Sequence, residues 1–580
     1  MADEEGLLNS DRVLALVTKV EEVTRSTDGG VKHFIEPARG TLSRATSRRH
    51  HLIFGRRGSG KSSLLRKAAA DLALDRRPNA YVNLEAFKGS SYPDVLLSVL
   101  ISTFERFNDW LETTSLNYAC QPSFGRKLWQ QINDSFPKLF RVRPSPTSSK
   151  LDMLAALSVR LRCQIEALKN QLHATDAAQI TVTAGTLENV ETVAGVGGRI
   201  LSPVGSASAA EKLSSAASHR EEIAEQFKRC KIDFLRHHIM EYQRNFLDIA
   251  ELSSGDSYLL LDDLYHIRRR NQPQVIDYLH RMAKDHKLWL KIGTIRHRAE
   301  WYFHTDPPVG IKLGDDADQI DLDMTLERYS IAKEFLLRIL ADLAHECDVE
   351  IAQLMTEGAV DRLVLASGGV ARDFLAVFRM SVDVSRERIR LHEQHGNRIN
   401  VEDVNVAAGE FESSKREEFK RDTSGEDQGL EQEFQRIRNF CLEEAESNCF
   451  LLDADAKGSQ IDLIHELADL KLLHRARAHV SVSGRPGKIF EAYMLDLSQY
   501  AGSRKRRGVT VIEFWNPRVV EDLSKVSLIY ELAPAGESRS PSPPLARQEH
   551  QALDDGPDGD EQQADSASPE NGDQPAPSSR

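Results

Sequence analysis

The sequence predicts an α/β fold in which helices cover a parallel β-sheet. The apolar segment His51–Gly55 is typical of a buried strand, and it leads directly into a glycine-rich loop. A helical pattern follows over Lys61–Leu74, and a second strand-like segment, Ala80–Leu84, comes next. Strand, loop, helix and strand in this order indicate a βαβ unit. Two later apolar segments, Ser257–Asp263 and Leu288–Thr294, are expected to join the same sheet.

The composition indicates a globular chain that works in a reducing compartment. The 580 residues are 40% hydrophobic and 28% charged, and this length predicts three or four domains. The acidic N-terminus shows no signal peptide, and no segment reaches the roughly 20 apolar residues that span a bilayer. Six cysteines without a CxxC pair predict neither a disulfide framework nor a zinc site. We therefore expect a cytoplasmic protein without membrane contact.

The net charge of −13 does not exclude a local basic face, because the acids are unevenly spread. From Glu537 onward the chain holds ten acidic residues and three arginines. This tail is also rich in proline, serine and glycine, and it cannot bury enough apolar area to offset its chain entropy. We expect it to be disordered.

Changes in pattern along the chain predict five parts. They are an N-terminal helical segment (1–50), a core (51–325) with a helical insertion at about 93–250, a helical lid (326–412), a small C-terminal module (434–532) and the disordered tail (534–580). In the insertion, Leu151–Leu172 and Arg220–Leu247 are long amphipathic helices, and the Gly/Ala/Ser-rich stretch Thr183–Ser218 is predicted to be a mobile tip. The insertion is either a solvated spacer or a functional hairpin. The charge-rich stretch Lys415–Glu431 is predicted to be a linker.

The glycine-rich loop has the spacing of a phosphate-binding loop, the Walker A pattern Gly-xxxx-Gly-Lys-Ser. Glycines let the backbone N–H groups wrap a phosphate, and the following helix directs its positive end at the anion. Lys61 is expected to reach the β- and γ-phosphates of ATP, and the Ser62 hydroxyl to bind Mg²⁺. The residues predicted to bind nucleotide are Gly55, Arg57, Gly58, Ser59, Gly60, Lys61, Ser62 and Ser63.

The strand ending in Asp262 and Asp263 is predicted to complete the metal site. An apolar strand delivers both carboxylates at its C-terminal end, where Asp262 is expected to bind the Mg²⁺ shell with Ser62. Asp263 is expected to orient or activate the attacking water. An aspartate at 263 is shorter than a glutamate and predicts slow hydrolysis. The alternative is a solvated strand end followed by a turn.

Together, the loop, the Asp-Asp strand end and Ile292-Gly-Thr-Ile-Arg296 resemble the AAA+/STAND class of ATPases. The resemblance implies that Thr294 is the polar sensor and that Arg296 approaches the γ-phosphate, both with catalytic roles. The segment Gly368-Gly-Val-Ala-Arg372-Asp-Phe-Leu-Ala-Val-Phe-Arg resembles the second-sensor helix of origin-recognition and archaeal initiator ATPases. It implies that Arg372 points from the lid toward the γ-phosphate. The resemblance covers roughly residues 30–110 and 255–410.

Each of these positions keeps an alternative interpretation. Arg296 and Arg298 are either a solvated loop or arginine fingers for a neighbouring subunit, and Arg372 is alternatively a charge on a helix surface. The segment Phe34–Pro37 either covers the adenine, as the resemblance implies, or is an apolar connector.

The C-terminal module resembles a winged helix, the domain that follows the lid in origin-recognition ATPases. The pattern predicts a helix over Ile461–His474, strands over His479–Ser483 and Ile489–Leu497, and a basic turn at Gly484–Lys488. Possible contacts to double-stranded DNA are Arg475, Arg477, Arg485 and Lys488, with the basic run Arg504–Arg507 beside them. The acids of the predicted helix, Asp462, Glu466 and Asp469, favour a protein contact instead.

Three functions are compatible with these features. The first is an ATP-binding, slowly hydrolysing switch that acts on DNA or in a DNA-associated assembly. The second is a signalling or defence scaffold in which ATP drives homo-oligomerisation and the winged helix binds protein. A motor is the least favoured, because accessory helicase motifs are not visible.

Overall fold

The computed structural model describes residues 7–24, 32–119, 146–194, 205–253, 255–391, 396–422, 428–501, 509–516 and 520–532. The predicted tail (534–580) and the basic run Arg504–Arg507 lie outside the described residues. Residues Met1–Glu531 form one compact unit. In the part of the chain that the structure describes, no helix is long and apolar enough to cross a membrane.

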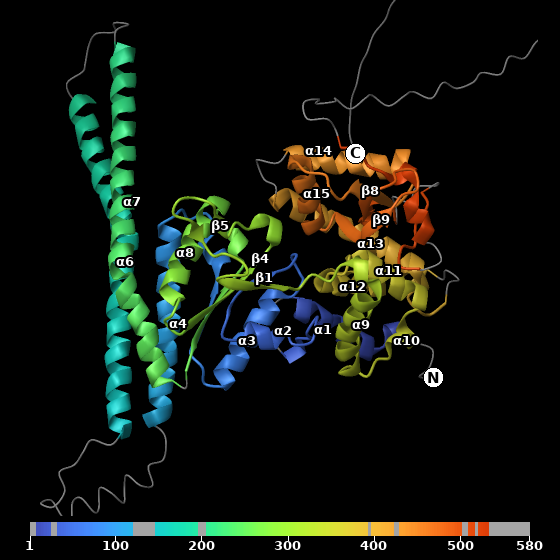
Figure 1. Ribbon diagram of the computed structural model, residues 1–580, viewed down its shortest axis with the longest axis horizontal. Coiled ribbons are helices and arrows are strands. Elements are labelled where there is room, and N and C mark those ends of the chain that lie inside the picture. The colour runs from blue at the N-terminus through green and yellow to red at the C-terminus, as the bar shows by residue number, and fades with distance from the viewer. Residues whose placement is uncertain are drawn as a thin grey trace, which may run out of the picture. The chain divides into compact units, whose positions relative to one another are not determined.

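The centre of the fold is a five-stranded parallel sheet (Figure 1). Its strands lie in the order β2-β3-β4-β1-β7. Their bounds are β1 His50–Phe54, β2 Asn79–Asn83, β3 Ser257–Asp262, β4 Leu288–Thr294 and β7 Ala317–Asp321. Four of these strands were predicted, whereas β7, which pairs with β1, was not. The sheet confirms the prediction of an α/β P-loop NTPase fold.

Helices cover both faces of this sheet (Figure 1). Successive residues of a strand point to opposite faces, so Leu52 of β1 joins one core cluster and Ile53 joins the other. Helices α2 (Thr41–Ala45) and α3 (Lys61–Leu74) cover the Ile53 face. On the Leu52 face lie α8 (Gln272–Ala283) and the helices of the insertion. All strands except the edges are therefore buried on both sides.

The insertion consists of three long helices, α4 (Asp94–Ala119), α6 (Pro146–Ala194) and α7 (Gly205–Leu252). Buried polar side chains join them: the Ser158 hydroxyl of α6 donates to the Asn108 side-chain oxygen of α4 at 2.7 Å. The predicted mobile tip was too long, because residues 183–194 belong to α6 and residues 205–218 to α7. Residues 195–204 lie outside the described residues.

The lid consists of helices that follow the sheet, and α1 (Asp11–Thr24) packs against two of them. The lid helices are α9 (Tyr329–His345), α10 (Ile351–Leu354), α11 (Glu357–Ser367), α12 (Ala371–Arg390) and α13 (Val401–Asp422). The linker prediction for Lys415–Glu431 was wrong at both ends, because α13 continues to Asp422 and α14 begins at Gln428. Within α13, the buried Lys415 ammonium donates to the carboxylate of Asp496 at 2.7 Å.

The C-terminal module is a three-stranded antiparallel sheet with two helices. The strand order is β8-β10-β9, and the elements are α14 (Gln428–Asn439), β8 (Cys449–Asp453), α15 (Ser459–Asp469), β9 (Leu473–Ser481) and β10 (Ile489–Leu495). The predicted helix was too long at its C-terminal end, because Leu473 and His474 already belong to β9. Strand β8 was not predicted. The winged helix stays a prediction.

Candidate nucleotide-binding site

The glycine-rich loop connects β1 to α3 and lies against the lid. Gly58 and Gly60 have φ angles of 90° and 96°, a backbone region that glycine adopts without penalty. A Cβ atom on Gly58 would lie 2.8 Å from the Cβ of Arg372, so the lid helix approaches the loop closely there. The Arg372 N–H also donates to the Gly58 carbonyl at 3.3 Å. The loop and the first turn of α12 are therefore in direct contact.

Lys61 is the buried cation of the site. Its ammonium donates to the carbonyls of Gly55 at 2.7 Å and Arg56 at 3.1 Å. Burial lowers the pKa of Lys61, and the carboxylates of Asp263, Asp323 and Asp262 oppose that shift. A phosphate would provide the full negative charge that a buried ammonium needs.

Asp262 ends strand β3 and is almost fully buried. One carboxylate oxygen accepts from the Tyr81 hydroxyl at 2.7 Å, and Ser62 also donates to this carboxylate. The other oxygen has no hydrogen-bond partner among the described residues. Burial raises the pKa of Asp262, and the charge of Asp263 raises it further. A buried carboxylate with an oxygen that accepts no hydrogen bond fits a divalent cation. The cation would offset both the cost of burying the negative charge and the cost of the missing hydrogen bond.

Asp263 follows strand β3 directly and lines a cavity beside the loop. Its backbone lies in the left-handed region (φ 58°, ψ 48°), which costs a non-glycine residue about 1–2 kcal/mol and is typical of functional turns. Burial raises the pKa of Asp263, while Lys61 lowers it. Ligand atoms of Asp263, Glu85 and His266 lie within 4.8 Å of one another. The sequence did not identify Glu85 or His266.

Of the remaining predicted residues, the structure brings Thr294 and Arg372 to the site but not Arg296. Thr294 ends β4, its carbonyl accepts from the Gly55 N–H, and its buried hydroxyl has no partner among the described residues. Arg372 lines the cavity with an exposed side chain. Arg296 instead lies over the Phe54 ring at 4.0 Å and faces Asp321 at 3.5 Å.

The cavity between the loop and the lid has a volume of about 300 Å³ and two chemically different ends. The polar end holds the loop, the two aspartates and Arg372. The apolar side chains come from five segments that are distant in sequence: Val23, Phe34, Ile35, Pro37, Leu322, Phe335, Ile339 and Leu375. The segment Phe34–Pro37 therefore lies where a base would lie if phosphates occupied the loop, although Glu36 itself accepts the N–H groups of Gly40 and Leu42.

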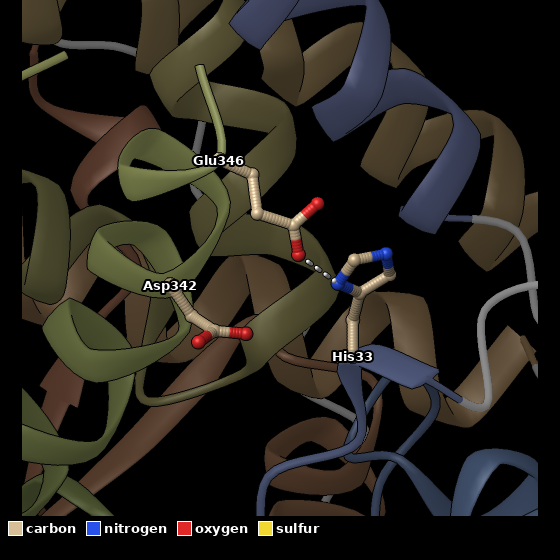
Figure 2. Close-up of side chains that lie close together, drawn as sticks. All are labelled: His33, Asp342 and Glu346. Carbon is tan, nitrogen blue, oxygen red and sulfur yellow. Dashed lines mark ion pairs between the residues drawn. The ribbon is translucent and has the colours of Figure 1, made fainter. Parts of the chain in front are cut away.

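His33 ties this segment to the lid (Figure 2). Its Nδ1 atom lies 3.2 Å from the carboxylate of Glu346, and Asp342 of α9 lies beside them. Three such ligand atoms can bind a metal ion in principle. Here the Lys19 ammonium already pairs with Glu346, so a cation of the chain supplies the positive charge. The cluster thus holds the segment that contains His33 against the C-terminal end of α9.

Known proteins resemble this chain only remotely. No protein-family model and no curated protein matches the sequence. Among solved structures, the Orc1 protein of Aeropyrum pernix in complex with DNA matches at 14% identity and a TM-score of 0.29, over 84% of this chain and 89% of that one. Cdc6p of Pyrobaculum aerophilum matches at 10% identity and a TM-score of 0.26, over 79% of this chain and 88% of that one.

A mutant of RuvB from Thermotoga maritima also matches, at 16% identity and a TM-score of 0.19, over 34% of this chain and 55% of that one. Similarity at this level carries no conclusion about the family or the function of this chain. The chemistry of the site rests on its own residues.

The C-terminal module contacts the core through the acids of α15. The Asp469 carboxylate accepts the His297 N–H at 3.3 Å, and Glu466 lies 3.8 Å from the Arg298 guanidinium. The His297 and His465 rings are 5.3 Å apart. Asp469 and Glu466 therefore make a contact within the chain.

Most of the basic residues proposed to contact DNA have carboxylate partners within the module. Arg475 donates to Glu491 at 2.8 Å, Arg485 to Glu531 at 3.0 Å, and Lys488 to Asp453 at 2.6 Å. Arg477 has no ion pair among the described residues. Within the described residues, three of these four basic side chains are therefore already paired with carboxylates.

Proposed function

We propose that this protein is a magnesium- and ATP-dependent switch ATPase of AAA+/STAND type that acts on DNA or in a DNA-associated assembly. One observation carries the proposal. Buried Lys61 and Asp262 and half-buried Asp263 meet at one cavity, and one carboxylate oxygen of Asp262 has no hydrogen-bond partner among the described residues there. Such atoms are costly unless a ligand satisfies them.

Each residue has a definite task in this proposal. Lys61 exchanges the loop carbonyls for β- and γ-phosphate oxygens, and Ser62 with Asp262 holds the metal. The bound Mg²⁺ would neutralise charge that develops on the phosphates. Asp263 orients the attacking water and accepts its proton, and its raised pKa makes it a stronger base than an exposed aspartate. Its short side chain keeps turnover slow.

The lid makes the site a switch rather than a simple hydrolase. Arg372 is the lid cation that lines the cavity, and its backbone N–H already bonds to the loop at Gly58. Its guanidinium would contact the γ-phosphate of ATP and lose that partner in ADP. A ligand shifts an equilibrium only by its differential affinity for two states, and this contact supplies the difference.

Nucleotide binding by the Lys61→Ala variant tests the site. Removing the ammonium should weaken binding of a fluorescent ATP analogue by at least about 30-fold, since a charge-assisted contact contributes about 2–3 kcal/mol. Lys67→Ala is the matched control, because Lys67 lies on the same helix and pairs with Asp71 outside the cavity. A folded Lys61→Ala protein that binds ATP like the wild type would remove the site assignment.

Turnover by Asp263→Asn tests the chemical step separately. The amide cannot accept the proton of the water, so we expect ATP affinity within about threefold of wild type and a loss of hydrolysis of about 100-fold, the usual contribution of a general base. Phosphate release under saturating ATP measures this. Unchanged turnover would exclude Asp263 from the mechanism.

The DNA part of the proposal is tested by fluorescence anisotropy of a labelled duplex with ATP and with ADP across a salt series. Affinity that falls steeply with salt and differs between the nucleotides supports it. Absence of binding in both states would favour the second candidate, an ATP-gated oligomerising scaffold whose C-terminal module binds protein. The carboxylate partners of Arg475, Arg485 and Lys488 favour that candidate. Light scattering that finds a monomer with and without ATP would count against it.

A further inference from the structure

A second cavity, here called the basic groove, lies away from the nucleotide site between the insertion and the core. It has a volume of about 650 Å³ and is open to solvent. Tyr92 precedes α4 and Lys228 belongs to α7, whereas Arg268 and Arg270 follow strand β3 and Phe303 belongs to β5 (Tyr302–Phe303). The groove therefore joins segments that are distant in sequence.

The cations of this groove differ from the other basic residues considered so far. Lys228, Arg268 and Arg270 are exposed, and none has an ion pair within the described part of the chain. Arg269, between the two groove arginines, faces Glu300 at 3.8 Å instead. Three uncompensated cations around one concave surface repel one another unless an anion lies between them. The arrangement favours an extended polyanion.

The other side chains of the groove favour a nucleic acid among the polyanions. The Tyr92 and Phe303 rings are half-buried at its wall and still reach the cavity. The Gln274 side-chain oxygen is buried at the groove without a hydrogen-bond partner among the described residues. Aromatic faces that stack bases, beside cations that follow the backbone, are typical of single-strand binding. An open amide oxygen can accept from a base amino group.

We propose that the basic groove binds a single nucleic-acid strand, with Lys228, Arg268 and Arg270 on its phosphates and a base against Phe303. This inference deepens the DNA part of the proposed function and rests on it. It replaces the C-terminal module as the principal source of phosphate contacts. Because the whole chain carries a net charge of −13, general attraction cannot hold a polyanion, and a local patch has to do so.

The test is anisotropy of a labelled 20-nucleotide oligothymidylate with the full-length protein across a salt series. The double variant Arg268→Ala/Arg270→Ala should weaken binding at least about 10-fold and reduce the salt slope by about 1.4, since each single-strand contact contributes about 0.7. Arg269→Ala, the matched control, should change affinity less than twofold. ATP affinity should be the same in all variants, because the nucleotide cavity lies elsewhere.

The outcomes separate this inference from the proposed function. If the wild type binds the strand and the double variant binds it equally well, the groove assignment is overturned while the DNA function stands. If the wild type binds neither strand nor duplex, both fail. Phe303→Leu should weaken oligothymidylate several-fold and leave inorganic polyphosphate unaffected. Equal effects on the two probes would make the groove a general polyanion site and overturn the nucleic-acid assignment.

Discussion

Changing Asp469 to asparagine tests the contact between α15 and the core. The carboxylate of Asp469 accepts the His297 N–H in this contact. Burial raises the pKa of Asp469 to about 6, and the negative charge of Asp323 adds to the rise. At neutral pH the group is ionised in an environment that favours its neutral form. The contact is therefore under electrostatic strain at neutral pH.

The size and sign of this strain follow from the pKa. A rise from 3.8 to about 6 corresponds to roughly 3 kcal/mol, and the partial solvent access of the side chain reduces this to about 1–2 kcal/mol. The docked state binds the Asp469 proton more tightly than the undocked state. The contribution of protonated Asp469 to the stability of the docked state is therefore complete below about pH 4 and is lost as the pH rises through 6. Asparagine keeps the hydrogen-bond acceptor and has no charge.

Hydrogen exchange of the α15 amides measures the docking free energy directly. At pH 7.5 we expect Asp469→Asn to exchange about 5–30-fold more slowly than wild type, which corresponds to 1–2 kcal/mol. At pH 5 the free-energy difference between the two proteins should be about half of that at pH 7.5, because Asp469 is then mostly protonated in the docked state. Asp462→Asn, on the same helix but exposed, is the control and should exchange like wild type. Equal protection of wild type and Asp469→Asn at pH 7.5, or faster exchange in the variant, would refute the reasoning.

Two further predictions concern the buried polar contact between lid and C-terminal module. Lys415→Met leaves the buried Asp496 carboxylate without its ammonium partner at 2.7 Å. We expect the free energy of unfolding, measured by thermal denaturation, to fall by about 3–5 kcal/mol. A fall of less than about 1 kcal/mol would show that the pair is not formed. Gly368 has a φ of 57°, and Gly368→Ala places a Cβ atom 2.0 Å from the His474 ring. We expect the free energy of unfolding, measured with denaturant, to fall by about 2–4 kcal/mol. A variant as stable as the wild type would contradict the close approach.

The sequence predicted those elements whose signal is local. Strands β1, β3 and β4 are continuous apolar runs because both faces of a parallel sheet are covered, and their bounds agree within one residue. Strand β7 was missed because it lies at the sheet edge, where Ala317 and Ile320 alone face the core. The linker prediction failed for a different reason. Lys415 looks solvated in sequence, and only Asp496, far along the chain, shows that it is buried.

In the candidate site, too, the sequence predicted the residues with a local signal and missed those that distant segments bring together. Lys61 and Ser62 follow from loop spacing, and the Asp-Asp strand end follows from the sheet. Glu85 and His266 come from turns after β2 and β3. Their approach to Asp263 depends on the order of the strands in the sheet, and no motif of fixed spacing in the sequence predicts it. The position of Arg296 over Phe54 likewise depends on side-chain packing that no motif records.

Arg56 links the phosphate-binding loop to the rest of the chain. Its buried guanidinium donates to the carbonyls of Met324 and Gly368, and its backbone N–H donates to Asp323. Gly368 in turn lies against His474, which bonds to the Asp496 carboxylate of the C-terminal module. Buried polar contacts of this kind have discrete arrangements, since a partial shift leaves a group unsatisfied. A loop that moves with the γ-phosphate must therefore keep this chain of contacts or break it as a unit, and the module is the element that such a break would release.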